Sequence, residues 1–277
     1  MGSRLEILNA GRLRLDGRKP LEFRSLAIEV GSSSISSPSV LSRPDGCARV
    51  QQGLTSVHAS VYGPREARSR GSTLHDRAIL DVEVEVDPWS GRERRKRSKG
   101  DRRTTEIEAA IKATFEPVLH LHLFPRSEVS IFVTVEHQDG GVLPCAINTV
   151  TLALLDAGIP MSDYVLGVCA GMHLASNQTL IDLSALEEGS LPSLVIAYLA
   201  RSRTVTLAQL ETRIHADALP GLVKIAGDAC AGVLLTEIDA AMRARTKKLA
   251  EAMGGKGPPY NVADISPDDS RSGIETS

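Results

Sequence analysis

The stretch from residue 129 to residue 158 constrains the fold more than any other part of the chain. Apolar side chains alternate from Val129 to Val135, and β-branched or aromatic residues are frequent there, which predicts a central β-strand. The strand stops at Asp139-Gly140-Gly141. Directly behind the glycines, an apolar stripe predicts a helix that ends at Gly158. A strand, a glycine turn and a buried helix therefore follow one another.

Further patterns extend this unit to a whole domain. The predicted strands are a hairpin within 47–62, one strand at 80–86, and four strands of a second sheet at 165–170, 179–183, 194–199 and 204–210. Helices are predicted at 104–120 and at 217–252, with an interruption near Gly227. Two sheets with packed helices predict an α+β fold.

We expect a single domain at residues 1–253, followed by a disordered tail at 254–277 that is rich in Gly and Pro. Residues 31–46 are rich in Ser, Pro and Gly and have no periodicity, which predicts a flexible loop. A second loop, at 90–103, is strongly basic.

The charge is uneven, although 32 Lys and Arg nearly balance 34 Asp and Glu. From Arg92 to Arg103 there are eight basic and two acidic residues. A charge run of this kind is ordinarily a solvated loop. Clustered arginines also bind phosphates through forked donors and counterion release, so RNA is a second interpretation. Aromatic residues make up only 3%, which predicts chiefly ionic contact with any nucleic acid.

Other classes of protein are disfavoured. The four cysteines are widely spaced without a CxxC motif, and no N-terminal apolar run resembles a signal peptide. We therefore expect a reduced intracellular protein without a disulfide framework. No run approaches about 18 uninterrupted apolar residues, so no membrane span is expected.

Three groups of residues are candidates for chemistry. Gly140-Gly141 can offer backbone N–H groups at a helix start to a phosphate, or can serve only as a turn. Asp182, Glu187 and Glu188 suggest a carboxylate pair or metal site, but no His or Cys accompanies them at ligand spacing, so surface acids are the simpler interpretation. His120 and His122 would share a face of an extended segment, as ligands or as core histidines. No metal or organic cofactor is predicted.

Several motifs resemble the RNase PH family, and within it the RNA exosome ring subunits related to the archaeal catalytic subunit. These motifs are Arg14–Arg18, Tyr62–Pro64, Glu116–Arg126, Gln138–Gly141 and Thr151–Met161. The likeness runs from about Ser3 to about Ala252. It implies an RNase PH-like fold of mixed sheets and helices, built from a repeated β-α unit, that works in a six-membered ring.

The resemblance also implies a site that can be checked. Active family members degrade RNA from its 3′ end by phosphorolysis and place Thr-Arg-Ser or Thr-Arg-Thr after the paired glycines. This chain has Val142-Leu143-Pro144 there, which supply no side-chain donor. A downstream acid that active members place after an Asp-Leu pair is also missing behind Asp182-Leu183. We therefore predict a degenerate site and an inactive relative of these exoribonucleases.

The alternative is an active phosphate-dependent 3′–5′ exoribonuclease. Its phosphate would be bound by another arginine, such as Arg126, at a composite site formed with a partner subunit.

RNA contact is implied for Arg102 and Arg103, with Arg65 and Arg68 on a loop that lines the RNA path in the family. The primary prediction is a scaffold that guides single-stranded RNA through a central channel for degradation and processing by an associated nuclease. The implied partners are other RNase PH-like subunits, S1/KH-type cap subunits, an associated exoribonuclease and single-stranded RNA. The implied location is the nucleus, nucleolus and cytoplasm. A protein-interaction module that never touches RNA is a third possibility.

Overall fold

The strand, turn and helix around the paired glycines form as predicted. The computed structural model describes residues 7–9, 11, 13–31, 44–66, 74–91, 94, 100–173 and 178–252. In it, strand β5 (Ser127–His137) leads through the glycine turn into helix α2 (Val142–Asp156). Most of the predicted loop at 31–46, positions 92, 93 and 95–99 of the basic loop, and the whole tail at 254–277 lie outside the described residues.

Strand β5 belongs to a five-stranded sheet with the order β1-β2-β3-β5-β4. The other members are β1 (Leu26–Val30), β2 (Gly46–Gln52), β3 (Thr55–Glu66) and β4 (Ile79–Val86). Only β4 and β5 pair in parallel, and the remaining neighbours are antiparallel. The predicted hairpin and the alternating strand at 80–86 are confirmed, since Leu80, Val82 and Val84 are all buried.

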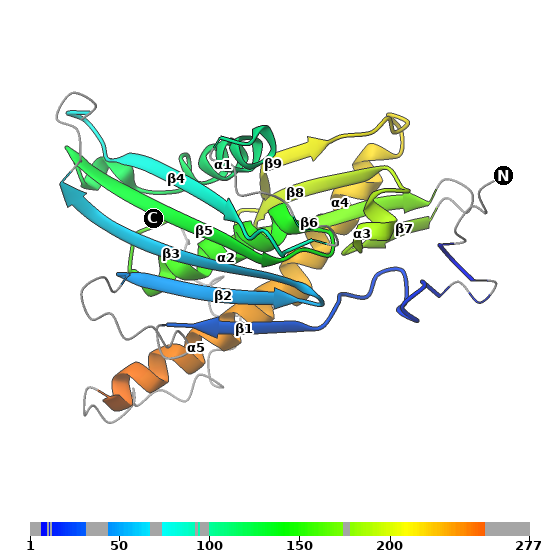
Figure 1. The fold of residues 1–277 in the computed structure, drawn as a ribbon, viewed down its shortest axis with the longest axis horizontal. Helices are drawn as coiled ribbons and strands as arrows, with labels where there is room; N and C mark the ends of the chain where they lie inside the picture. The colour runs from blue at the N-terminus through cyan, green and yellow to red at the C-terminus, as the bar shows by residue number, and fades with distance from the viewer. Residues whose placement is uncertain are drawn as a thin grey trace, which may run out of the picture. The chain divides into compact units, whose positions relative to one another are not determined.

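The second sheet is fully antiparallel, with the order β7-β6-β8-β9. Its strands are β6 (Val165–His173), β7 (Gln178–Ile181), β8 (Ser193–Leu199) and β9 (Thr204–Leu210). Helix α2 contacts strands of both sheets (Figure 1). Every residue from Pro144 to Leu154 is buried. Because α2 is covered on all sides, its first turn and the glycines are held at the junction of the sheets.

The remaining helices are α1 (Arg102–Phe115), α3 (Ala185–Glu188), α4 (Leu219–Ala229) and α5 (Leu235–Ala252). Helix α1 ends before the predicted His120, because Pro117 cannot donate a backbone hydrogen bond. A short 3-10 turn, η2 (Leu121–Leu123), follows.

The C-terminal helix is not interrupted at Gly227, where the sequence predicts a break. A Cβ there would lie 3.0 Å from the Tyr198 ring, so the glycine allows close packing within a continuous helix. The irregular segment is the π-helical turn η3 (Cys230–Leu234), which joins α4 to α5.

The chain divides into two compact units, residues 1–242 and 243–277, and the structure describes residues 243–252 of the second. By length and composition alone, the helical run Leu219–Glu251 could cross a membrane. Core helices pass the same test, and Leu222, Ala226 and Leu234 lie in the hydrophobic core. Within the apolar window of this run 28% is buried, so packing covers part of its apolar surface.

Candidate functional site

The paired glycines adopt left-handed backbone conformations, with φ of +81° at Gly140 and +62° at Gly141. A Cβ at Gly140 would lie 2.6 Å from backbone atoms of Ser184 and Ala185, so this close approach requires glycine. Gly141 is the N-cap of α2 and has no side chain to cap the helix. Its backbone N–H donates to Oε2 of Glu188 at 3.2 Å. A carboxyl group therefore lies at the open start of the buried helix.

Arg24 and Asp182 lock this turn in place. Oδ1 of Asp182 accepts hydrogen bonds from Nη2 and Nε of Arg24 at 2.7 and 2.9 Å, and Oδ2 accepts one from the Arg24 backbone N–H at 2.7 Å. The same guanidinium donates to the carbonyl oxygens of Asp139 and Gly140 at 2.8 and 3.3 Å. Burial alone would lower the pKa of Arg24, but the hydrogen bond and charge of Asp182 outweigh it and raise that pKa. Asp182 is thus committed to a structural ion pair.

Glu187 forms a similar buried ion pair, with Arg14. Nη2 and Nε of Arg14 donate to the two carboxylate oxygens at 2.6 and 2.8 Å, and both side chains are almost completely buried. Glu187 also accepts the backbone N–H of Ser184 in a capping box at the start of α3. Burial works to raise the pKa of Glu187, yet the Arg14 bond and charge lower it overall.

Glu188 differs from these two carboxylates. It makes no ion pair with any of the residues that the structure describes. Burial raises the pKa of its carboxyl group, and the negative charge of Glu211 adds to the shift despite the Gly141 hydrogen bond. Of the three acids that the sequence grouped together, Glu188 is the one that no arginine holds among the described residues, and its carboxyl group contacts the glycine turn.

The three residues after the glycines offer no polar side chain, as predicted. Pro144 is buried, and Val142 and Leu143 are half-buried against the core. The first turn of α2 in this chain therefore lacks a side-chain anion ligand.

The predicted RNA-binding arginines lie at two ends of the first sheet. The backbone carbonyl of Ser90, four residues beyond β4, accepts a hydrogen bond from the backbone N–H of Gln138, next to the glycine turn. The N-terminal half of α1 contacts the same end of β4, since the Glu108 carboxylate accepts a hydrogen bond from the backbone N–H of Val84. Arg102 and Arg103, exposed at the start of α1, therefore belong to the end of the sheet that carries the glycines. Arg102 pairs with Glu106 at 2.9 Å.

Arg65 lies at the opposite end. Thr55, at the start of β3, donates to the carbonyl of Gly140, whereas Arg65 is ten residues further along, roughly 30 Å away. Its guanidinium lies 4.4 Å above the Tyr62 ring and 3.7 Å from a carboxylate oxygen of Asp45. Arg126 precedes β5 and is likewise remote from the turn. Arg68 lies outside the described residues.

The histidine pair and the acids do not assemble a metal site. The rings of His120 and His122 are 5.6 Å apart across the 3-10 turn. No group of three or more His, Cys, Asp or Glu able to hold a metal ion occurs among the described residues.

Comparisons with known proteins place this arrangement in a family. Residues 22–160 match the model of the 3′ exoribonuclease family, domain 1, known as RNase PH. The chain belongs to the RNase PH family. A relative from Mus musculus, exosome complex component RRP41, is 35% identical over 252 residues, or 90% of this chain and 98% of that protein. Exosome complex component Rrp41 of Pyrobaculum neutrophilum is 34% identical over 250 residues, or 89% and 96%.

The RNase PH-like fold predicted from the sequence is confirmed. The crystal structure of rice (Oryza sativa) Rrp46 has a TM-score of 0.69 and 24% identity, and the match covers 83% of this chain and 98% of that one. The RNase PH motifs quoted from the sequence thus identified both family and fold.

The prediction of an inactive relative is wrong. The matching family is described as one of 3′ exoribonucleases, and relatives named Rrp41 from mouse and from archaea align along about nine-tenths of the chain. That prediction treated the missing donors at Val142, Leu143 and Pro144 as a lost site. It also rested on the acid missing behind Asp182-Leu183, whereas the structure places the Glu188 carboxyl group at the glycine turn.

Proposed function

We propose that this RNase PH chain is a catalytic subunit of an exosome-type ring. It shortens single-stranded RNA from the 3′ end by phosphorolysis, at a composite site that a partner subunit completes. The family description and the relatives named as exosome complex components support the ring and the reaction class. The observation that carries the proposal is the protonatable carboxyl group of Glu188 at the glycine turn.

In this reaction an oxygen of inorganic phosphate attacks the last phosphodiester of the RNA. The bond to the 3′ oxygen of the preceding nucleotide breaks, a nucleoside diphosphate is released, and that 3′ oxygen takes up a proton. An acid is needed beside the leaving oxygen. Because the pKa of Glu188 is raised, its carboxyl group stays protonated to higher pH than an ordinary glutamic acid, which suits this role.

The attacking phosphate also needs a cationic clamp, and this chain lacks one at the turn. Val142, Leu143 and Pro144 supply no donor, and Arg24 is occupied by Asp182. A partner subunit therefore supplies the arginine. Arg126 of this chain is exposed at the far end of β5, so it can serve a neighbour's site and not its own.

The exposed pair Arg102 and Arg103, at the glycine end of the sheet, binds the RNA backbone as it approaches the site. Arg65 and Arg68 contact the RNA further along its path. RNase PH-like subunits complete the ring, S1/KH-type subunits cap it, and an associated exoribonuclease cooperates with it in the nucleus, nucleolus and cytoplasm.

The test is release of nucleoside diphosphate from 3′-labelled RNA by this chain assembled with its PH-like partners and no other nuclease. Release should require inorganic phosphate and should fall by about a hundredfold or more in Glu188→Gln. The matched control is Glu83→Gln, which changes an exposed glutamate on β4 and should leave the rate unchanged. An assembled ring that releases no diphosphate, or a Glu188→Gln ring of full activity, would overturn the proposal.

A further inference from the structure

Trp89 is the only tryptophan of the chain, and its side chain lies at the surface. The residue is 63% exposed, although tryptophan is highly buried on average. A single exposed apolar residue is common in soluble proteins, so its surroundings decide whether the ring has a function.

Hydrogen bonds fix the backbone around Trp89. The backbone N–H of Ser90 donates to the carbonyl of Asp87 at 3.0 Å, which closes a tight turn with Trp89 inside it. The carbonyl of Ser90 accepts the backbone N–H of Gln138, also at 3.0 Å. Gln138 directly follows β5 and lies two residues before Gly140. The exposed indole therefore stands on an anchored turn beside the paired glycines.

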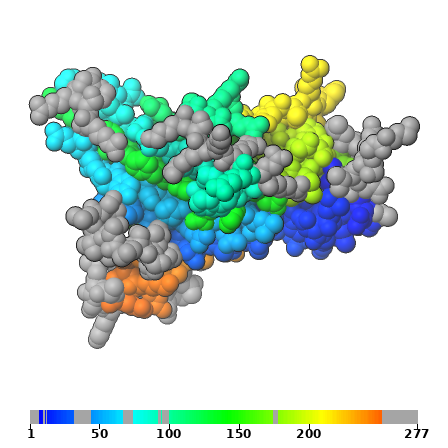
Figure 2. Space-filling view, viewed as in Figure 1, coloured from blue at the N-terminus to red at the C-terminus, as the bar shows by residue number. Residues whose placement is uncertain are grey.

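The start of helix α1 lies beyond the same end of β4. Glu108 accepts the backbone N–H of Val84, near the end of the strand. The carbonyl of Leu121, which follows the helix, accepts the backbone N–H of Ala78, just before the strand begins. Helix α1 thus runs antiparallel to β4, and its two exposed N-terminal arginines lie on the same side as the Trp89 turn. In Figure 2 the cyan-to-green part of the chain, which holds β4 and α1, reaches the surface.

The charge near this turn favours a polyanionic ligand. Trp89 precedes the basic run 92–103, which has eight basic and two acidic residues, and Arg102 and Arg103 at its end are exposed. An apolar side chain of a partner protein would suit the indole alone. A strand of RNA supplies both a flat aromatic base and phosphates, so it suits the indole and the arginines together.

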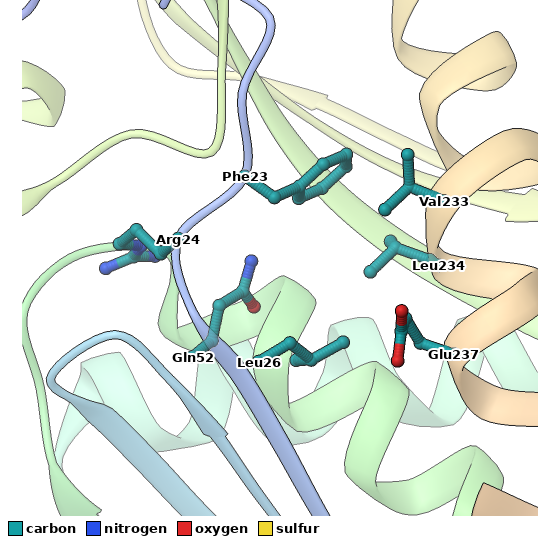
Figure 3. A pocket seen from close by; sticks show the side chains of 7 residues that line it. All are labelled: Phe23, Arg24, Leu26, Gln52, Val233, Leu234 and Glu237. Carbon is teal, nitrogen blue, oxygen red and sulfur yellow. The ribbon is translucent and has the colours of Figure 1, made fainter. Parts of the chain in front are cut away.

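The cavity between the start of the first sheet and the C-terminal helix does not suit RNA (Figure 3). Its volume of about 190 Å³ is below the roughly 300–1,000 Å³ of ordinary ligand pockets. Of its charged lining residues, Arg24 is held by Asp182, and the exposed carboxylate of Glu237 repels phosphate. Its apolar walls are Phe23, Leu26, Val233 and Leu234. The open surface at Trp89 is therefore the place where a base can stack.

We propose that the Trp89 ring stacks on an unpaired base of the RNA that reaches the glycine turn, while Arg102 and Arg103 hold the RNA backbone. This inference rests on the proposed function, because it names how the substrate of that site is held. Stacking on an aromatic ring tolerates every base and strengthens binding by about five- to 150-fold per base. Contact with RNA is then ionic apart from one aromatic platform, which agrees with the low aromatic content of the chain.

The first test is fluorescence anisotropy of labelled single-stranded RNA with the assembled ring, in the absence of inorganic phosphate so that binding is measured apart from cleavage. Trp89→Ala should weaken binding by at least about fivefold and leave its salt dependence unchanged, because no phosphate contact is lost. Trp89→Phe keeps an aromatic face and should bind within about threefold of the unaltered ring. Val205→Ala, which changes an exposed apolar side chain on β9, is the matched control and should bind normally.

The second test uses a fluorinated tryptophan in this chain and ordinary tryptophan in its partners, so that the fluorine NMR signal of the ring comes from Trp89 alone. The signal should shift with single-stranded RNA and stay unchanged with a blunt RNA duplex, whose bases are already stacked on one another. Full affinity of Trp89→Ala would overturn the inference and leave the proposed function standing, whereas a ring that binds no single-stranded RNA would overturn both. A shift on ring assembly with none on addition of RNA would assign Trp89 to a subunit contact and also overturn the inference.

Discussion

Arg14 and Glu187 form a buried ion pair with 2.6 Å between Nη2 and Oε2, across a sequence separation of 173 residues. Arg14 also donates to the carbonyl oxygens of Ile181 and Asp182, so one guanidinium ties the N-terminal segment to the end of β7 and to α3. Glu188 is the next residue in α3. The pair therefore fixes the position of the acid that faces the glycine turn.

Replacement of Arg14 by Met should destabilise the protein by about 3–5 kcal/mol, because Glu187 is left charged and unpaired in the interior. Urea unfolding followed by circular dichroism measures the loss. The double variant Arg14→Met with Glu187→Leu removes both charges and should be more stable than the single variant. Equal stability of the two variants would show that the ion pair is not the reason for the loss.

Replacement of Gly140 by Ala should cost about 2–4 kcal/mol, since the new Cβ meets both a left-handed φ and the backbone at Ser184 and Ala185. Gly158→Ala is the matched control. It has a similar φ of +71° but nothing within 4 Å of a Cβ, so it should cost only about 1 kcal/mol. Thermal unfolding of both variants distinguishes the cost of the close contact at Gly140 from the cost of the left-handed backbone conformation. Equal costs would argue against a tight contact at Gly140.

Local sequence patterns predicted most of the elements because each has a strong periodicity of its own. The alternation from Leu80 to Val86 and the glycines before α2 are signals of this kind. The roles of the acids were beyond such patterns. Asp182 and Glu187 differ from Glu188 in having arginine partners, which lie more than 150 residues away in the sequence. That distinction depends on contacts between residues that are distant in the sequence. Without those contacts, the missing clamp alone predicts an inactive site.

The pH dependence of phosphorolysis should report Glu188. An acid that must be protonated is active below its pKa, and the pKa of Glu188 is raised chiefly by burial. The rate should therefore decline as pH rises through that value. Glu188→Gln cannot lose a proton, so its much lower residual rate should lack this decline. Diphosphate release by the assembled ring from pH 5 to 9 measures both profiles. The same decline in the variant would assign it to another group.

Charge reversal at Arg102 and Arg103 should weaken RNA binding by the assembled ring and flatten its salt dependence, by roughly one unit of slope for each lost phosphate contact. The ring should still assemble, because both side chains are exposed. Fluorescence anisotropy with labelled single-stranded RNA at several salt concentrations gives the slope. Arg243→Glu on α5, an exposed arginine far along the sequence, is the comparison variant. An unchanged slope for the double variant would remove these arginines from the RNA path.

Between pH 7.5 and 5.5, His58 should contribute a loss of folding stability as pH falls. Burial lowers the pKa of His58, the charge of Arg49 adds to the effect, and Glu136 opposes it only in part. Its buried Nε2 has no partner among the described residues, so a proton there gains no hydrogen bond. Between the folded pKa and the ordinary value near 6.5 the unfolded chain binds more protons, which favours unfolding as pH falls. The pKa of Glu136 is lowered from 4.5, despite burial that acts to raise it, so its own effect lies below this window. Urea unfolding at three pH values should therefore show a shallower slope in His58→Gln, whereas His137→Gln, at the exposed end of β5, should keep the original slope. Identical slopes in all three proteins would mean that His58 is as easily protonated in the folded state as in the unfolded chain.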